Sequence, residues 1–210
     1  LEDMNESGIP VVLVDRDIRG SHLDGVFLDD YRGAYQATEA LVCKGHRDIA
    51  IVCGPTTSRT GVERLNGYIG ALRAKGLPVH EEYILYGEYR EDMAYNLTKK
   101  LLHTQPQVTA VMSSNSIMAG GCMRAIRECN LAIPDDIAFI SYGKKDYYDQ
   151  TGSNISYVAR PVHSVGEECA KILLQKMEMG KKSKRQPQKR IVFSMNLFLN
   201  GSEAFPKNRK

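Results

Sequence analysis

Apolar and polar residues follow two different rhythms along this chain. Short continuous apolar runs, such as Ile49–Cys53, are typical of strands buried on both faces. Between these runs, apolar residues recur every three or four positions, which predicts helices with one buried face. The runs predict strands at 10–15, 25–29, 49–53, 83–86, 110–113, 137–141, 156–158 and 191–199. The periodic segments predict helices at 31–44, 63–75, 91–103, 116–129 and 162–179.

Strands that alternate with helices predict an α/β fold, in which a mainly parallel sheet carries helices on both faces. Ligands of such sheets bind in the crevice beyond the carboxyl ends of the strands. The strand Ile49–Cys53 stops at Gly54-Pro55, and Arg64 lies near the start of the helix that follows. Because a guanidinium binds hydroxyls, carboxylates or phosphates through two parallel hydrogen bonds, this stretch indicates a small-molecule binding domain.

Composition narrows the class of protein. The 210 residues are 42% apolar and 25% charged, as in ordinary globular proteins, and they suffice for one large domain or two small lobes. A net charge of +3 is too small to indicate nucleic-acid binding by this segment. The one basic stretch, 181–190, is interpreted as a solvated surface loop rather than a nucleic-acid contact.

The cysteines favour a reducing compartment, and hence a cytoplasmic protein. All five lie inside apolar patterns without metal-ligand spacing, which predicts buried, inert thiols: Cys43, Cys53, Cys122, Cys129 and Cys169. We therefore expect no metal and no cofactor. No apolar run approaches the roughly 20 residues of a membrane span, so we expect no membrane partner. His46, which follows a helix C-cap, is interpreted as a packing residue, and the sequence offers no nucleophile and base at catalytic spacing.

Six segments together resemble the regulatory domain of the LacI/GalR family of bacterial transcription regulators. Their order and spacing are more specific than any one of them. They are Gly8-Ile-Pro-Val-Val-Leu-Val-Asp-Arg16, Asp29-Asp-Tyr-Arg-Gly-Ala34, Gly45-His-Arg-Asp-Ile-Ala50, Arg64-Leu-Asn-Gly-Tyr68, Ser114-Asn-Ser-Ile-Met-Ala-Gly120 and Ile133-Pro-Asp-Asp-Ile137.

The resemblance implies a two-lobed periplasmic-binding-protein-like fold, in which each lobe is a mainly parallel sheet flanked by helices. The chain would cross between the lobes three times, near Asp29, Arg160 and Ile191. Lobe one would comprise 1–29 plus 161–190, and lobe two 30–160 plus 191–205, with 206–210 as a tail. Leu1 to Gly8 read as the end of a helix, so we expect the natural protein to begin upstream. The family's DNA-binding headpiece is absent from these residues.

The resemblance also implies a ligand cleft. Asp15 and Arg16 would face it from lobe one, with a surface ion pair as the alternative role. Arg64 matches the effector-binding arginine of the family, and its alternative role is a salt bridge to Glu63 or Asp48. Asn115 would lie at the edge of the cleft, either capping the helix that follows or binding ligand, and the two roles are compatible.

Three departures from the family pattern change the expected ligand. Asn115-Ser116 stands where the family usually has Asn-Asp, and Tyr142-Gly143-Lys144 where it usually has Phe-Asp-Asp. Arg160 precedes Pro161 where the family commonly has glutamine. Three acids are lost and two cations gained, and buried cations need partners, so we hypothesise an anionic effector such as a sugar phosphate. The alternative is that Lys144 is merely solvated.

The resemblance thus implies the effector-binding and dimerisation domain of a DNA-binding transcriptional regulator. Its partners would be a sugar-like effector, operator DNA reached through the headpiece, and a second copy of the chain. Apolar helix faces near 65–72 or 117–123 are candidate dimer surfaces. The alternatives are a periplasmic solute-binding protein with the same fold, and an enzyme with a doubly wound α/β fold, which no catalytic constellation supports.

Overall fold

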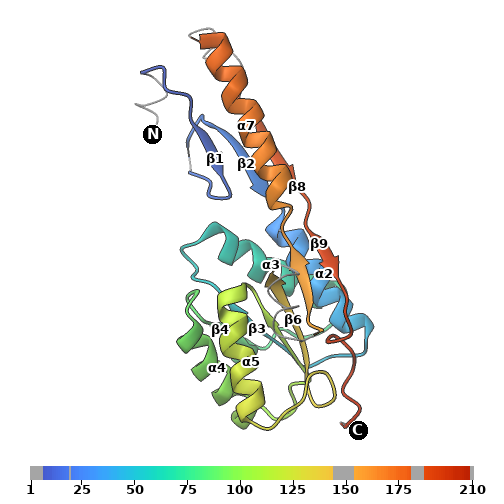
Figure 1. The fold of residues 1–210 in the computed structure, drawn as a ribbon. Helices are drawn as coiled ribbons and strands as arrows, with labels where there is room; N and C mark the ends of the chain where they lie inside the picture. Colours follow the sequence, from blue (N-terminus) through green and yellow to red (C-terminus); the bar gives the residue numbers. More distant parts are fainter. Residues whose placement is uncertain (1–6, 19, 144–153, 181–186, 209–210) are drawn as a thin grey trace. The chain divides into compact units, whose positions relative to one another are not determined.

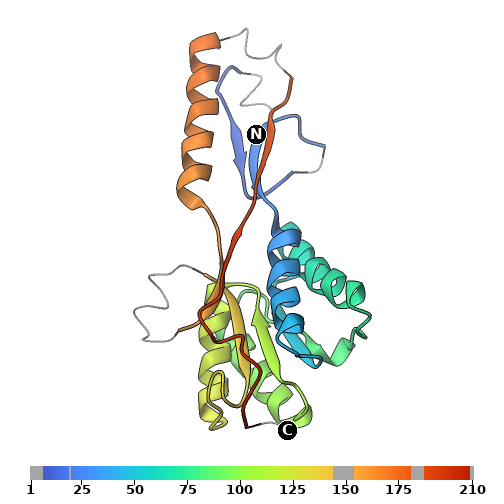
Figure 2. The same cartoon turned by 90° about the vertical axis from the view of Figure 1, so that its right-hand side faces the viewer.

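The computed structural model describes residues 7–18, 20–143, 154–180 and 187–208 (Figure 1). The chain divides into two compact units, each assembled from segments that are distant in sequence. Unit 1 contains Leu1–Asp29 and Arg160–Met195, and unit 2 contains Asp30–Ala159 and Asn196–Lys210. Figure 2 follows the chain through both units from a second direction.

Unit 2 is built on a six-stranded sheet with the order β4-β3-β5-β6-β7-β9. Neighbouring strands are parallel, except that β9 runs antiparallel to β7. The central strands β3, β5 and most of β6 are buried, as their continuous apolar runs predict. The strands are β3 (Ile49–Cys53), β4 (Ile84–Tyr86), β5 (Ala110–Ser113), β6 (Ala138–Gly143), β7 (Ser156–Ala159) and β9 (Asn196–Phe198).

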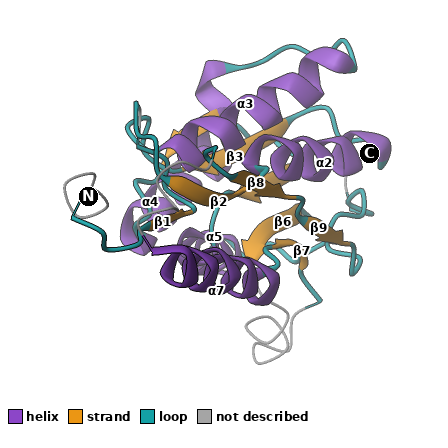
Figure 3. Ribbon diagram, turned by 90° about the horizontal axis from the view of Figure 1, so that it is seen from above, coloured by secondary structure: helices purple, strands orange, loops and turns teal. Residues whose placement is uncertain are grey.

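Helices cover both faces of this sheet. Figure 3 shows α2 (Asp30–Cys43) and α3 (Arg59–Ala74) on one face, and α4 (Glu91–Thr104) and α5 (Ser116–Glu128) on the other. Each helix turns an apolar side toward the strands, and the largest fully buried side chains include Phe139, Ile51 and Met118. Burial of such a side chain stabilises the fold by about 1.5–3 kcal/mol. The predicted α/β class, with helices on both faces of a parallel sheet, is confirmed for this unit.

Unit 1 is smaller. Its sheet has the order β1-β2-β8 and is parallel throughout, with β1 (Val12–Val14), β2 (Asp24–Leu28) and β8 (Arg190–Phe193). The long helix α7 (Val162–Met179) lies along these strands and turns Val165, Cys169 and Ile172 inward. A small cluster around Phe27 forms the apolar core of the sheet.

The last predicted strand is two strands. The sequence predicts one strand over 191–199, but β8 pairs with β2 in unit 1 and β9 pairs with β7 in unit 2. Ile191 therefore lies inside a strand of unit 1, and the chain passes between the units after Met195 rather than near Ile191. The other two passages lie between Asp29 and Asp30 and between Ala159 and Arg160.

Smaller corrections concern helix starts and one thiol. Helix α3 begins at Arg59 rather than at residue 63, because the Ser58 side chain caps it by accepting a hydrogen bond from the backbone of Gly61. Tyr83 closes the short 3-10 helix η1 (Glu81–Tyr83), and β4 starts after it. All five cysteines are free thiols, but Cys43 is exposed and Cys129 half-buried, so the prediction of burial is wrong for these two.

His46 has the packing role that its position predicts. Its ring is fully buried, with Nδ1 2.9 Å from Thr109 Oγ1 and Nε2 3.2 Å from the Glu203 carbonyl oxygen. The ring also packs on Phe205, so His46 ties the C-terminal segment to unit 2. Burial lowers the pKa of His46, because the charged imidazolium would lose its hydration.

Candidate ligand-binding site

Polar side chains gather where the parallel strands of unit 2 end. Strand β3 runs into Gly54, β5 into Ser114, and β6 contributes Tyr142 close to its end. The first residues of α2 and α3 lie at the same edge, and together these residues form what we call the strand-end site. This edge is where ligands of parallel sheets bind.

Arg64 is the centre of the strand-end site. Its Nε donates to Asp30 Oδ1 at 2.6 Å, and its Nη1 donates to the carbonyl oxygen of Ser114. The guanidinium carbon lies 4.1 Å from the centre of the Tyr142 ring, whose hydroxyl donates to the Asp30 carbonyl oxygen at 3.1 Å. Arg64 thus joins the start of α2 to the ends of β5 and β6, which holds three elements of the site in fixed positions.

The Arg64–Asp30 pair is almost fully buried, with side-chain exposures of 6% and 0%. Burial is the largest single influence and opposes the charge on Arg64, but Asp30 together with Tyr142 and Tyr89 outweighs it and raises the pKa of Arg64. Arg64 therefore stays charged. The expected alternative, a salt bridge to Glu63 or Asp48, is wrong. Glu63 pairs with Arg59 at 3.9 Å, and Asp48 accepts a hydrogen bond from Tyr83.

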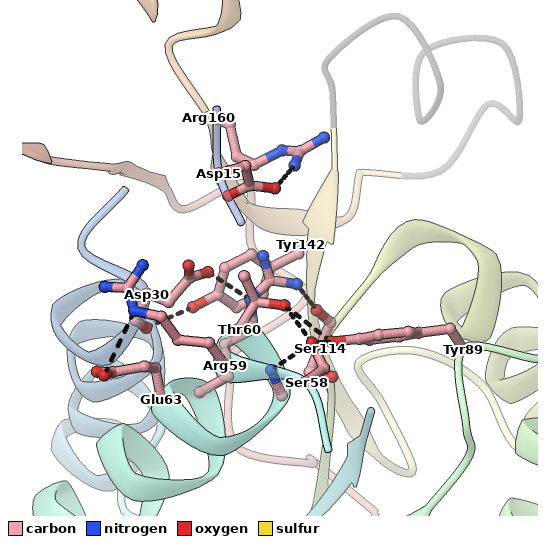
Figure 4. A network of polar contacts seen from close by, with 12 residues as sticks. Asp15, Asp30, Ser58, Arg59, Thr60, Glu63, Tyr89, Ser114, Tyr142 and Arg160 are labelled. Carbon is pink, nitrogen blue, oxygen red and sulfur yellow. Dashed lines mark hydrogen bonds and ion pairs between the residues drawn. The ribbon is translucent and has the colours of Figure 1, made fainter. Parts of the chain in front are cut away.

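Three hydroxyl groups meet beside this pair. Thr60 Oγ1 lies 2.9 Å from Ser58 Oγ and 2.9 Å from the Tyr89 hydroxyl, and Ser58 Oγ lies 3.2 Å from the same hydroxyl. In Figure 4, Tyr89 reaches toward Ser58 and Thr60 at the start of α3. We call these three residues the hydroxyl cluster. Hydroxyls both donate and accept hydrogen bonds, as do the hydroxyls of a sugar.

The Tyr89 ring packs directly over Gly54. A Cβ atom at Gly54 would lie 2.1 Å from Tyr89 Cε1, so only glycine leaves room for the ring. The backbone at Tyr89 and at Glu88 is left-handed, with φ of 57° and 53°. Such conformations cost of order 1–3 kcal/mol in non-glycine residues and cluster at ligand sites. Tyr89 as a whole is half-buried.

Asn115 caps α5, as the sequence predicts. Its Oδ1 accepts a hydrogen bond from the backbone of Met118 at 2.8 Å, which satisfies one free donor of the first turn. The cap places Asn115 directly after β5, beside the carbonyl group that binds Arg64. Its role as a ligand residue stays a prediction.

The predicted ligand residues of unit 1 form a looser group. Arg160 Nη1 lies 3.3 Å from Asp15 Oδ2, with side-chain exposures of 45% and 31%. Asp15 follows β1 with φ of 63°, and the backbone of Arg16 donates back to Val14 across it in a tight turn. Arg16 itself is exposed. Lys144 lies outside the described residues.

These partners change the basis of the anion hypothesis. The hypothesis takes Arg160 and Lys144, near Arg64, to be cations in need of a counter-charge. Arg64 and Arg160 each have a carboxylate partner, Asp30 and Asp15 respectively, so the hypothesis is untested only for Lys144. Asp30 and Tyr89 are members of the site that the sequence does not reveal. Asp30 appears in the sequence only within the family segment Asp29–Ala34, and Tyr89 has no local signal besides its place after β4.

A family comparison agrees with this architecture. The model of the periplasmic binding protein-like domain matches residues 38–202, most of unit 2 and the whole of α7. The chain belongs to this family. Within it, the chain is 30% identical over 176 residues to the HTH-type transcriptional regulator CelR of Thermobifida fusca, covering 83% of this chain and 52% of that protein.

Two solved members of the family share the fold. A regulatory protein of the LacI family from Chloroflexus aggregans is 32% identical to this chain in sequence, with a TM-score of 0.85. The matched region covers 97% of this chain and 72% of the Chloroflexus protein. CelR in a complex with cellobiose is 28% identical to this chain, with a TM-score of 0.85. The matched region covers 95% of this chain and 60% of the CelR chain. The resemblance to LacI-type regulators is confirmed. The chain spans about half the length of the curated relatives it matches.

Within the described residues, no helix is both long and apolar enough to cross a lipid bilayer. The same residues contain no group of three or more histidine, cysteine, aspartate or glutamate side chains placed to hold a metal ion.

Proposed function

We propose that this chain is the effector-binding domain of a DNA-binding transcriptional regulator, and that its effector is a sugar-like small molecule. The observation that carries the proposal is the end-to-end likeness to LacI-type regulators, one of which is described as a complex with cellobiose. The named relatives are HTH-type regulators rather than enzymes or transport proteins. This favours regulation over the periplasmic solute-binding alternative.

The strand-end site suits such an effector. Arg64 has guanidinium hydrogens beyond the two that bind Asp30 and Ser114, and the hydroxyl cluster offers further donors and acceptors. The ring of half-buried Tyr89 supplies an apolar face for the carbons of a sugar. We propose Arg64, Asn115 and Tyr89 as ligand residues of unit 2, and Asp15, Arg16 and Arg160 as ligand residues of unit 1.

A phosphorylated sugar is the anionic form of this proposal. Helix α3 starts at the strand-end site, and helix N-termini favour anions. In unit 1, a phosphate would have to displace Asp15 from Arg160. An exposed ion pair of this kind is worth only about 0–1 kcal/mol, so the exchange is inexpensive.

The remaining partners follow from the relatives. We propose that operator DNA is bound through a helix-turn-helix segment of the whole protein, that the protein acts in the cytoplasm, and that it forms a homodimer. The candidate dimer surfaces are the helix faces near 65–72 of α3 and 117–123 of α5, and in the second of these Ile117 is 56% exposed.

A thermal-shift panel tests the proposal, because a ligand that binds only the folded state raises the melting temperature by mass action. Free sugars and their phosphate esters are compared on wild type and on Arg160→Gln. A shift with phosphate esters that Arg160→Gln abolishes would establish the anionic form. A shift with free sugars in both proteins would leave a neutral effector. If no compound in the panel shifts either protein, the sugar-like effector is wrong.

A further inference from the structure

Unit 2 contains a cavity at the opposite end of its sheet from the strand-end site. The cavity has a volume of about 610 Å³, within the range of about 300–1,000 Å³ that is usual for small-molecule sites. It lies where α5 ends and before β6 and β7 begin. Its lining includes Met123, Arg127, Leu131 and Ile133. It shares no residue with the strand-end site.

One wall of this cavity is the apolar core itself. Ile126 and Ile155 belong to the buried core of unit 2, and Met123, Leu131 and Ile133 pack against that core while still lining the cavity. A ligand in the cavity would therefore cover apolar side chains that are now only half-buried.

The polar groups of the cavity are fixed or positively charged. Asn200 Nδ2 donates to the Ile155 carbonyl oxygen at 2.8 Å, and Ser202 Oγ donates to the Phe139 carbonyl oxygen, so these side chains are held in place. Among the described residues that line the cavity, Arg127 carries the one charge and there is no carboxylate.

Arg127 differs from its neighbour on the same helix. Arg124 Nη1 pairs with Glu91 at 3.4 Å, and its guanidinium lies 4.3 Å from the centre of the Tyr95 ring. Among the described residues, Arg127 has no such partner, and its side chain is exposed at the rim of the cavity. An unpaired guanidinium beside an apolar wall complements a ligand with an anionic head and an apolar body.

We propose that this cavity is a second ligand site, and that it takes a small amphipathic organic anion. The anionic group binds Arg127, and the apolar part lies against Met123, Leu131 and Ile133. The site is distinct from the effector site proposed above and does not depend on it, because the two lie at opposite ends of the same strands.

The test uses 8-anilinonaphthalene-1-sulfonate, an amphipathic aromatic anion whose fluorescence rises in apolar surroundings. Its binding to the folded chain is titrated for wild type, Arg127→Gln, and Arg124→Gln as the matched control. We expect saturable binding to wild type, weakened about tenfold or more by Arg127→Gln, since a charge-assisted hydrogen bond is lost. Arg124→Gln leaves the affinity unchanged.

A second pair of variants tests the apolar wall. Met123→Trp fills the cavity and reduces binding, whereas Met123→Leu conserves the volume and preserves it. The chain has no tryptophan, so the new indole also reports any residual binding by energy transfer to the probe. Circular dichroism confirms that each variant is folded. The proposal is overturned if wild type shows no saturable binding, or if Arg127→Gln and Arg124→Gln bind the probe equally well.

Discussion

The two units each hold an arginine–carboxylate pair at the end of a strand or the start of a helix, and the two pairs differ in almost every physical respect. Arg64 and Asp30 are 2.6 Å apart and buried, whereas Arg160 and Asp15 are 3.3 Å apart and largely exposed. A buried pair cannot lose one partner without leaving an uncompensated charge, but an exposed pair opens at little cost. Arg64 is therefore a structural part of its site, and Arg160 is free to exchange its partner.

The largest expected loss of stability follows from removal of the buried guanidinium of Arg64. Arg64→Met leaves the Asp30 carboxylate buried without its partner, and should lower the free energy of unfolding by about 3–5 kcal/mol. Urea denaturation measures the loss. The double variant Arg64→Met, Asp30→Asn removes both charges and should recover much of it. A loss below about 1 kcal/mol for the single variant would show that the pair is solvated.

A smaller effect is expected where Tyr89 packs over Gly54. Gly54→Ala forces the ring away from the new methyl group, and should cost about 1–3 kcal/mol through overpacking. The matched control lies in unit 1. Gly166 is within α7 and a Cβ atom there meets nothing within 4 Å, so Gly166→Ala should stabilise the chain by about 0.5–1 kcal/mol. The assignment is wrong if Gly54→Ala is at least as stable as wild type, or if Gly166→Ala is less stable than wild type.

A buried and an exposed histidine should differ in how much they make the stability of the chain depend on pH. Burial lowers the pKa of His46 in the folded state, so the unfolded chain takes up a proton first as the pH falls below about 6.5. The contribution of His46 to stability is therefore complete above that pH and is lost progressively below it.

Urea denaturation of wild type at pH 7 and pH 5 should show this loss. His46→Gln should reduce the difference between the two pH values, and His163→Gln, which replaces a histidine exposed on α7, should preserve it. The account of His46 fails if both variants show the same pH dependence.

The smallest effect is expected at the exposed pair. Arg160→Gln should change the free energy of unfolding by less than about 1 kcal/mol, because solvent screens the pair it breaks. Denaturation in low and high salt separates this screened interaction from packing. A loss comparable to that of Arg64→Met would mean that the two pairs are not different in kind.

The sequence predicts where the strands lie better than it predicts which strands pair with one another. The buried runs at β3, β5 and β6 locate the central strands, because continuous apolar segments have few alternatives in a parallel sheet. The split of 191–199 into β8 and β9 could not be read from periodicity, since the two strands differ only in their partners.

The site shows the same limit. Arg64 could be placed near the strand ends from the order of the elements, but its partner Asp30 is 34 positions away, and local spacing gives no sign of it. The packing of Tyr89 over Gly54 is a long-range contact of the same kind. The sequence shows how many cations the site has but not which of them have a carboxylate partner. Because Arg64 and Arg160 are paired, the case for an anionic effector is weaker than the sequence indicates.

The central claim is that the strand-end site of unit 2 binds a sugar-like effector. The most direct measurement is the melting temperature of wild type, Tyr89→Ala and Tyr86→Ala against free sugars and sugar phosphates. Tyr86 is an exposed tyrosine at the end of β4, the strand that precedes Tyr89. It serves as the matched control. The account predicts that at least one compound stabilises wild type and Tyr86→Ala equally and stabilises Tyr89→Ala much less. An equal shift in all three proteins, or no shift in any, would contradict it.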